Sequence, residues 1–188
     1  GVWRDRPNRV TVANMAEKGL NATAAALLGL LHEGPMTGGQ LMATAENRLG
    51  PFWTTTRSQV YRELPVLAER GFVRLGRPGP RSSQPYAITA SGKRVFAKWL
   101  SEDAGRDQLR NPLMLRAAFG SLHKPQQLQE LYAERREEHT ARLAELREEL
   151  KEVKKRDDPF QAATLEFAIQ YQRSILKWLD TAPGISGS

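Results

Sequence analysis

The 188-residue sequence contains no cysteine, only three histidines, and few aromatic residues, which make up 7% of the chain. Without cysteine there is no disulfide framework and no thiolate chemistry, as is typical of a reducing compartment. No apolar run approaches the roughly 20 residues that a membrane-spanning helix needs, and no secretory signal pattern is visible. We therefore expect a cytoplasmic protein without a membrane partner.

The groupings that catalysis or metal binding would need are also missing from the sequence. His32, His123 and His139 lie far apart, and none has a second histidine or a cysteine at ligand spacing. No nucleophile can be paired with a base, and the glycines at 38–39 fit a helix start rather than a nucleotide-binding loop. The dense carboxylates within 134–149 fit a solvated helix face. The sequence therefore predicts no enzyme activity, no metal and no cofactor.

What the sequence does contain is positive charge, and this charge is concentrated in the first half. The whole chain carries 28 Lys and Arg against 21 Asp and Glu, with a pI near 10.0. Residues 1–105 hold 14 basic and 8 acidic side chains, whereas residues 106–188 hold 14 and 13. A basic half favours a polyanion as partner, most often nucleic acid, although plain solubility is the alternative interpretation.

Composition and breaks in periodicity divide the chain into four predicted parts. Residues 1–21 are interpreted as an N-terminal extension, in which 1–14 lack clear periodicity and are either a vector-derived tag or an upstream remnant, with Met15 as the natural start. A winged helix-turn-helix domain is predicted over 22–104, a helical dimerisation domain over 105–182, and a flexible tail over 183–188. The predicted fold class is mainly α with a small β-hairpin wing and C-terminal coiled-coil-like helices.

The winged-helix prediction begins with three short helices. A buried helix over 23–35 is stopped by a Gly-Pro pair, and Thr37 with Gln40 forms a capping-box pattern for a second helix over 38–49. Thr56 and Gln59 repeat the pattern for a third helix. Its buried stripe is formed by Val60, Leu64 and Leu67.

Pro65 falls in the interior of the third helix, where it removes one backbone hydrogen bond. A kink or local widening is the favoured accommodation, and a true break of the helix is the alternative. Strands over 72–75 and 85–89 then enclose a Gly/Pro-rich turn. A fourth helix over 90–102 is capped by Thr89 or Ser91 and is expected to turn its larger apolar side chains inward: Val95, Phe96, Trp99 and Leu100.

Three helices followed by a hairpin give the order of a winged helix-turn-helix, whose third helix enters the DNA major groove. A position in the major groove explains why the first turns of that helix expose polar side chains, because Arg and Gln form bidentate contacts with base edges. The wing has no acidic residue between Arg70 and Gln84 and suits phosphates or a minor groove, with a solvated loop as the alternative. The predicted DNA-binding residues are Thr37, Thr56, Arg57, Ser58, Gln59, Tyr61, Arg62, Arg74, Arg77 and Arg81.

Three segments of this half resemble the PadR family of bacterial transcriptional regulators: "ALLGLLHEGPMTGGQL" (26–41), "SQVYRELPVLAERGFV" (58–73) and "PYAITASGKRVFAKWL" (85–100). Two positions depart from the family pattern, namely Gly39 in place of an aromatic residue and Arg62 in place of a proline. The resemblance implies a homodimer whose C-terminal helices embrace the partner subunit. It also implies that some members release DNA when a small ligand binds between the DNA-binding and dimerisation parts.

The second half reads as helices throughout. A short helix starts at Pro112, a long one runs from Pro125 to about Arg156, and a last one starts at Pro159 after Asp158 as its cap. The long helix carries an apolar seam that includes His139. This seam is expected to pack on the last helix, on a second copy of the chain, or on both. The predicted dimerisation residues are Leu143, Leu146, Leu150, Val153, Phe167, Tyr171, Ile175 and Trp178, and Phe160 is placed on the same face of the last helix.

An effector pocket is proposed for four aromatic residues, for which ordinary core packing is the alternative: Phe96, Trp99, Phe119 and Trp178. The function that these patterns favour is a homodimeric DNA-binding transcriptional regulator, more specifically a repressor that reads an inverted repeat in double-stranded DNA. A winged-helix protein–protein adaptor is one alternative. A small-molecule sensor with secondary DNA binding is another.

Overall fold

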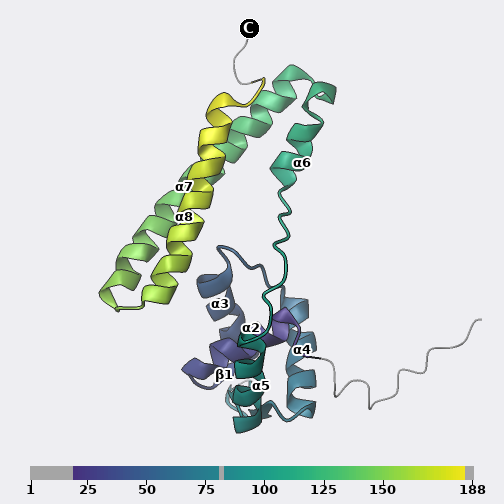
Figure 1. Ribbon diagram of the computed structural model, residues 1–188, viewed down its shortest axis with the longest axis vertical. Coiled ribbons are helices and arrows are strands. Elements are labelled where there is room, and N and C mark those ends of the chain that lie inside the picture. Colours follow the sequence, from purple (N-terminus) through teal and green to yellow (C-terminus); the bar gives the residue numbers. More distant parts are fainter. Residues whose placement is uncertain (1–18, 81–82, 185–188) are drawn as a thin grey trace, which may run out of the picture. The chain divides into compact units, whose positions relative to one another are not determined.

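The computed structural model describes residues 19–80 and 83–184. The chain forms two compact units, one up to Gly105 and one from Arg106 onward, which are described separately below (Figure 1). The predictions for Met15, for residues 1–14 and for Arg81 lie outside the described residues, as does most of the predicted C-terminal tail.

Within residues 19–80 and 83–105, the first unit has the three helices, the hairpin and the fourth helix that the sequence predicts. The predicted fold class, mainly helical with a small β wing, is confirmed. The helices and strands are α2 (Ala22–Leu30), the 3-10 turn η1 (Leu31–Glu33), β1 (Met36–Thr37), α3 (Gly38–Leu49), α4 (Arg57–Glu69), β2 (Val73–Leu75), β3 (Pro85–Ile88) and α5 (Ala90–Leu100).

Side-chain caps explain why these helices begin where they do. Asn21 accepts from the backbone of Ala24 at the start of α2, at 2.8 Å. Thr89 caps α5 through the backbone N–H of Gly92, and its own hydroxyl donates to the Gly71 carbonyl at 2.7 Å. Thr89 is therefore the cap, and the alternative of Ser91 is wrong, because Ser91 already lies in the first turn.

Helix α4 runs unbroken through Pro65, so the alternative of a helix break is wrong. The proline ring is exposed, while Leu64 and Leu67 on either side are buried. The lost hydrogen bond therefore falls on the solvated side of the helix, where a carbonyl without a backbone donor costs least.

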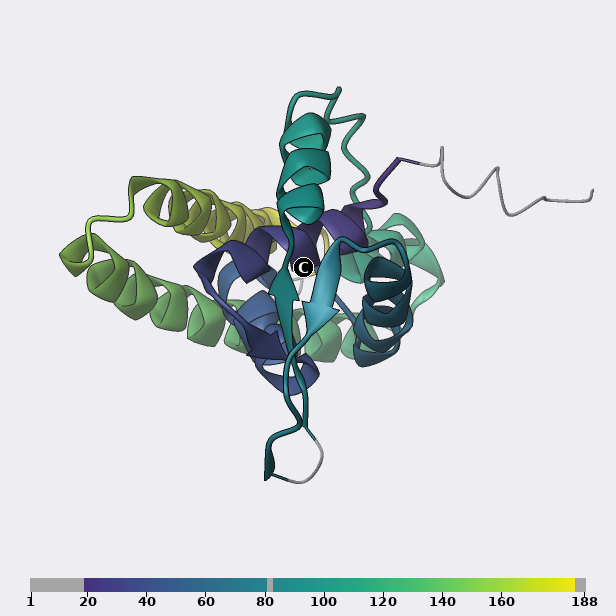
Figure 2. The same cartoon turned by 90° about the horizontal axis from the view of Figure 1, so that it is seen from below.

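A three-stranded antiparallel sheet replaces the two-stranded hairpin of the prediction. Its order is β1-β3-β2, with Val73 opposite Ile88 and Thr37 opposite Pro85. Figure 2 shows β2 and β3 side by side, continuing into the wing loop. Strand β1 is only two residues long and was not predicted, because a pair of residues carries no periodicity.

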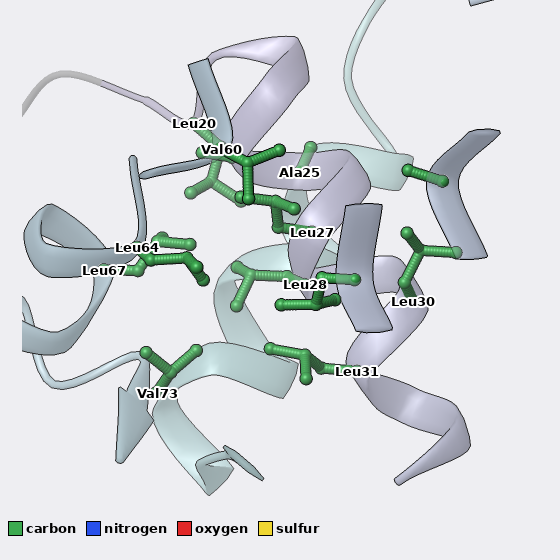
Figure 3. Close-up of a cluster of buried hydrophobic side chains, with 13 residues drawn as sticks. Leu20, Ala25, Leu27, Leu28, Leu30, Leu31, Val60, Leu64, Leu67 and Val73 are labelled. Carbon is green, nitrogen blue, oxygen red and sulfur yellow. The ribbon is translucent and has the colours of Figure 1, made fainter. Parts of the chain in front are cut away.

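The core of the first unit is aliphatic and draws on all of its helices (Figure 3). Leu28, Val60 and Leu64 are fully buried at its centre. Val95, Phe96 and Trp99 of α5 pack against this core as predicted. Leu100 does not, and its predicted inward position is wrong: 62% of it is exposed, because it lies in the last turn of α5, beyond the reach of the core.

The second unit consists of α6 (Pro112–Ala118), a 3-10 turn η3 (Gly120–Leu122), α7 (Pro125–Lys155) and α8 (Pro159–Thr181) within the residues described. Asp158 caps α8 as predicted, accepting from the backbone of Gln161 at 2.9 Å. α7 and α8 lie side by side and antiparallel (Figure 1). They bury two apolar clusters, one around Tyr132 and Leu179 and one around Leu146 and Leu165.

The apolar face predicted on α8 is only partly covered within one chain. Phe160 and Phe167 are exposed, at 85% and 62%, whereas Ile175 is buried. The buried stripe advances by three and four residues in alternation, as in a coiled coil, along Leu165, Ala168, Gln172, Ile175 and Leu179. This stripe contains an alanine and a glutamine, which no apolar pattern in the sequence indicated.

Among the described residues no helix is both long and apolar enough to cross a membrane.

Candidate nucleic-acid interface

The first turn of α4 is held by a reciprocal capping box. The Thr56 hydroxyl accepts from the backbone N–H of Gln59 at 3.3 Å, and the Gln59 side-chain oxygen accepts from the backbone N–H of Thr56 at 2.9 Å. Arg57 and Ser58 between them are exposed. The predicted N-cap is confirmed, and a rigid helix start presents these two side chains to solvent.

Gln59 is half-buried, and its oxygen is already occupied within the capping box. Its amide NH2 group keeps donor capacity. A bidentate contact with adenine needs both the oxygen and the amide, so Gln59 would have to leave the box to make one. The predicted base contact by Gln59 stays a prediction, and the structure adds a competing role in capping.

Tyr61 connects the start of α4 to the start of α3. A Cβ placed on Gly38 would lie 2.9 Å from the Tyr61 ring, so the ring sits directly on the glycine. The Arg57 guanidinium lies 5.2 Å from the centre of the same ring, within cation–π range. This stack of Gly38, Tyr61 and Arg57 brings the N-termini of two helices together, and N-termini favour phosphate groups.

Thr37 joins α3 to the wing. It caps α3 in a second capping box, with its backbone N–H donating to the Gln40 side-chain oxygen at 2.8 Å, as predicted. It also pairs with Pro85 as part of strand β1. Because Tyr61 packs on the neighbouring Gly38, the root of the wing and the first turns of α4 meet at this one segment.

The wing is cationic. Arg74 and Arg77 are exposed, and neither has an acidic partner in the described part of the chain. A shallow groove at the root of the wing is lined by both arginines and by Pro35, Pro78 and Pro85, among others. Exposed guanidinium groups without carboxylates are available for phosphates.

The two units differ in how their charges are paired. In α7 most cations have a carboxylate three residues away or on α8, as in the 2.8 Å pair of Arg136 with Asp180. Lys155 also holds the pKa of the Glu152 carboxyl below its ordinary value through a hydrogen bond and its positive charge. On α4, Arg62 lies 3.6 Å from Glu63, and Arg57 has no such neighbour among the residues described. Most of the positive charge of α7 is therefore paired with carboxylates. In the first unit Arg48 is paired with Glu33, whereas Arg57, Arg74 and Arg77 have no carboxylate partner among the described residues.

The four aromatic residues of the predicted effector pocket divide between the units. Phe96 stacks on Trp99 with ring centres 6.0 Å apart, and the His32 ring lies 5.0 Å from the Phe96 ring. Trp178 meets Tyr132 edge to face, at 5.6 Å. Phe119 is 57% exposed. Phe96, Trp99 and Trp178 therefore each have part of their ring packed within their own unit. A role of the four aromatic residues in ligand binding stays a prediction.

The residues predicted for dimerisation are mostly used within one chain. Leu143, Leu146 and Val153 are buried between α7 and α8, and Leu150 packs beside them. Tyr171 accepts a hydrogen bond from the Asn111 side chain at 2.9 Å. Their part in a dimer stays a prediction.

Two contacts of the structure were not foreseen. The Tyr61 ring packs so closely on residue 38 that only glycine fits there without a shift of the ring. The pair of glycines after Thr37 is the one sequence feature that could have indicated this contact. His139 donates to the Gln172 side-chain oxygen at 2.5 Å, in the layer between the two apolar clusters. Among the described residues, no three His, Cys, Asp or Glu side chains are grouped so as to hold a metal ion.

Comparison with known proteins agrees with this arrangement. Residues 27–98 match the family described as "Transcriptional regulator PadR-like family", and residues 109–184 match the one described as "Virulence activator alpha C-term". The negative transcriptional regulator PadR of Bacillus subtilis (strain 168) is 26% identical over 168 residues, which cover 83% of this chain and 92% of the relative.

Solved structures give the same result. The crystal structure of Bacillus subtilis PadR in complex with operator DNA superimposes with a TM-score of 0.73 at 24% identity, covering 86% of this chain and 97% of that one. The crystal structure of Bacillus subtilis PadR in complex with p-coumaric acid gives a TM-score of 0.68 at 25% identity, covering 86% and 96%. With both units matched in order along the sequence, residues 27–98 form a PadR-like domain and the chain as a whole is similar to transcriptional regulators of the PadR-like family.

Proposed function

We propose that this regulator is a cytoplasmic repressor that binds an inverted-repeat operator in double-stranded DNA as a homodimer. The observation that carries the proposal is the set of exposed arginines at the start of α4 and on the wing, of which Arg57, Arg74 and Arg77 lack a carboxylate partner within the described chain. The contacts of Tyr61 with Gly38 and of Thr37 with Pro85 support one continuous surface.

On this proposal, the first two turns of α4 enter the major groove. Arg57, Ser58 and Arg62 contact base edges and nearby phosphates, and Gln59 joins them if it leaves its capping box. Thr37, Thr56 and Tyr61 hold the sugar–phosphate backbone at the two helix N-termini. The wing arginines contribute charge without reading sequence.

Exposed apolar residues in the second unit support a homodimer. Leu122 is 81% exposed and Phe160 is 85% exposed, and Leu115, Phe119 and Phe167 are each more than half exposed. Large apolar side chains on one small unit are typical of a surface that binds another protein. A two-fold dimer would present two copies of α4 to two half-sites, as an inverted repeat requires.

We further propose that a small aromatic ligand controls DNA binding. A relative in this family has been crystallised with p-coumaric acid, and this chain keeps Phe96, Trp99 and Trp178 only partly buried. If so, an aromatic carboxylic acid quenches tryptophan emission and weakens DNA binding in the same concentration range. Quenching without any change in DNA affinity would show that the ligand binds but does not regulate DNA binding, and this result would contradict the regulatory role.

The test of the main proposal is a titration of the protein with DNA from its own upstream region and with a scrambled duplex, at two salt concentrations. Specific binding at one dimer per inverted repeat is expected. Arg57→Ala should weaken the specific complex by about 1–3 kcal/mol and reduce the preference for it. Arg77→Ala should weaken both complexes and lower the slope of log affinity against log salt by about one.

Equal, weak and strongly salt-dependent binding to both duplexes would overturn the operator proposal and leave only a basic surface. The protein–protein adaptor would then be the better interpretation. Mass measurement of the free protein decides the dimer independently, because a monomer at micromolar concentration contradicts it.

A further inference from the structure

Two large aromatic residues are exposed in the loop that leads into α4. Phe52 and Trp53 are 45% and 43% exposed. Their backbone is nevertheless fixed, because the N–H groups of Phe52 and Trp53 both donate to the Leu49 carbonyl, at 2.9 and 2.7 Å. The two rings are thus held outward by an ordered turn, at the end of α3.

The segment around this turn is positive. Residues 47–62 contain three arginines and no acidic residue. Arg48 forms an ion pair with Glu33, so the charge left without a carboxylate partner among the described residues is mainly that of Arg57. An exposed tryptophan among cations has an apolar ring and one N–H donor to offer, and no acceptor. A DNA backbone matches that chemistry, since its phosphates accept hydrogen bonds, its sugars are apolar, and its charge attracts the surrounding arginines.

The position of the turn also fits a backbone contact. Trp53 precedes the N-cap Thr56 by three residues, and the intervening chain is not helical. Three extended residues span about 10 Å at most, which is less than the roughly 12 Å width of the major groove. When the first turn of α4 lies in the groove, this loop passes the sugar–phosphate strand at the groove edge.

We propose that the Trp53 indole N–H donates a hydrogen bond to a DNA phosphate at the edge of the groove, with Phe52 against the adjoining sugar. This contact rests on the proposed entry of α4 into the major groove. It fixes the angle at which α4 enters, and it is independent of base sequence. Trp53 is therefore a positioning residue for the arginines of α4.

The contact has a property that separates it from the arginine contacts. The indole is neutral, so its loss releases no counterion and leaves the salt dependence unchanged. A hydrogen bond to a charged group contributes enough that its loss should weaken binding about tenfold. The expected signature is weaker binding to every duplex, with unchanged salt slope and unchanged sequence preference.

The experiment compares wild type, Trp53→Ala, Trp53→Phe and a control, Leu100→Ala, by anisotropy of a labelled duplex. The control removes an apolar side chain that is 62% exposed in the same unit but lies outside the proposed surface. The upstream and scrambled duplexes are each measured at two salt concentrations, and circular dichroism checks folding. Both Trp53 variants should bind both duplexes about tenfold more weakly, and Leu100→Ala should bind like wild type.

Wild-type affinity in both Trp53 variants overturns the proposal while leaving the proposed function intact, and it would point to a protein as the partner of this turn. Loss of binding in Trp53→Ala but not in Trp53→Phe also overturns it, because ring packing rather than the N–H would then be responsible. Should Trp53→Ala fail to fold, Trp53→Phe alone decides, since it keeps a ring in the same place. Absence of DNA binding by wild type would instead overturn the proposed function itself.

Discussion

Gln59 caps α4, and the proposed function adds a contact of the same side chain with DNA; substitution can separate these two roles. Gln59→Glu keeps an oxygen for the capping box but loses the amide donor and adds negative charge. We expect its thermal stability to stay at the wild-type level while DNA affinity falls. Gln59→Ala should lose both, with about 0.5–1.5 kcal/mol of stability removed along with the cap.

Thermal unfolding together with duplex titration checks this pair of variants. Wild-type DNA affinity in Gln59→Glu would mean that the amide makes no contact and that Gln59 serves the helix only. The two variants would then differ in stability alone.

Gly38 and Gly39 are neighbours with different surroundings, and they make a matched pair. A Cβ on Gly38 meets the Tyr61 ring at 2.9 Å, whereas a Cβ on Gly39 meets nothing within 4 Å. Gly38→Ala should push the ring aside, lower the free energy of unfolding by about 1–3 kcal/mol, and weaken DNA binding. Gly39→Ala should be neutral or slightly stabilising, because alanine favours helix over glycine.

Urea unfolding and duplex titration of both glycine variants provide the measurement. If the two variants are equally stable, Tyr61 is free to move and does not align the two helices. The Gly38 requirement could not be predicted from the sequence, because it depends on a side chain 23 positions later.

At the scale of elements, the starts of helices were predictable and the contacts between elements were not. Thr37, Thr56 and Asp158 were each identified as caps, because a cap is decided within four residues. Strand β1 depends on pairing with β3, almost fifty residues away, and has no local pattern of its own. The burial of Ala168 and Gln172 in α8 could not be predicted for a related reason, since they are buried only because α7 covers them.

The hydrogen bond between His139 and Gln172 is the polar layer of the α7–α8 pair. Gln172→Leu alone should lower the free energy of unfolding by about 1–3 kcal/mol, because it leaves the His139 N–H without its acceptor. His139→Leu with Gln172→Leu should recover most of this loss, since two apolar residues of suitable size pack in the seam.

Denaturant unfolding of the two single variants and the double variant gives a double-mutant cycle that measures the coupling directly. Additive effects would show that the hydrogen bond contributes nothing specific. A positive coupling would identify this layer as the feature that sets the register between the two helices.

At the scale of the whole molecule, the two units are joined by a segment that makes few contacts. Residues 101–110 are all exposed, and 103–110 lie outside any helix or strand. We expect trypsin to cut first after Arg106 or Arg110, releasing two folded fragments, because ordered helices resist proteolysis. Mass spectrometry of a short digestion identifies the sites, and first cuts within α7, for example after Lys155, would contradict the division into units.

The uneven charge of the chain was visible in its composition, and the basic half is the one that matches the PadR-like family of transcriptional regulators. The sequence did not show whether a given cation is paired with a carboxylate, because such pairing depends on how the helices pack on each other. Arg136, for example, faces Asp180 across 44 positions of sequence, while Arg74 faces no carboxylate within the described residues.

Thr37 belongs at once to the ladder of β1 with β3 and to the cap of α3, one residue from the glycine under Tyr61. A shift of the wing root should therefore reach α4 through the backbone of Thr37 and Gly38 and the Tyr61 ring that packs on it. A genetic selection for regulators with altered target preference should accordingly recover changes at Pro85, a residue that need never touch a base. Such changes would alter the preferred DNA sequence of a regulator while the residues of α4 that are proposed to contact bases stay the same.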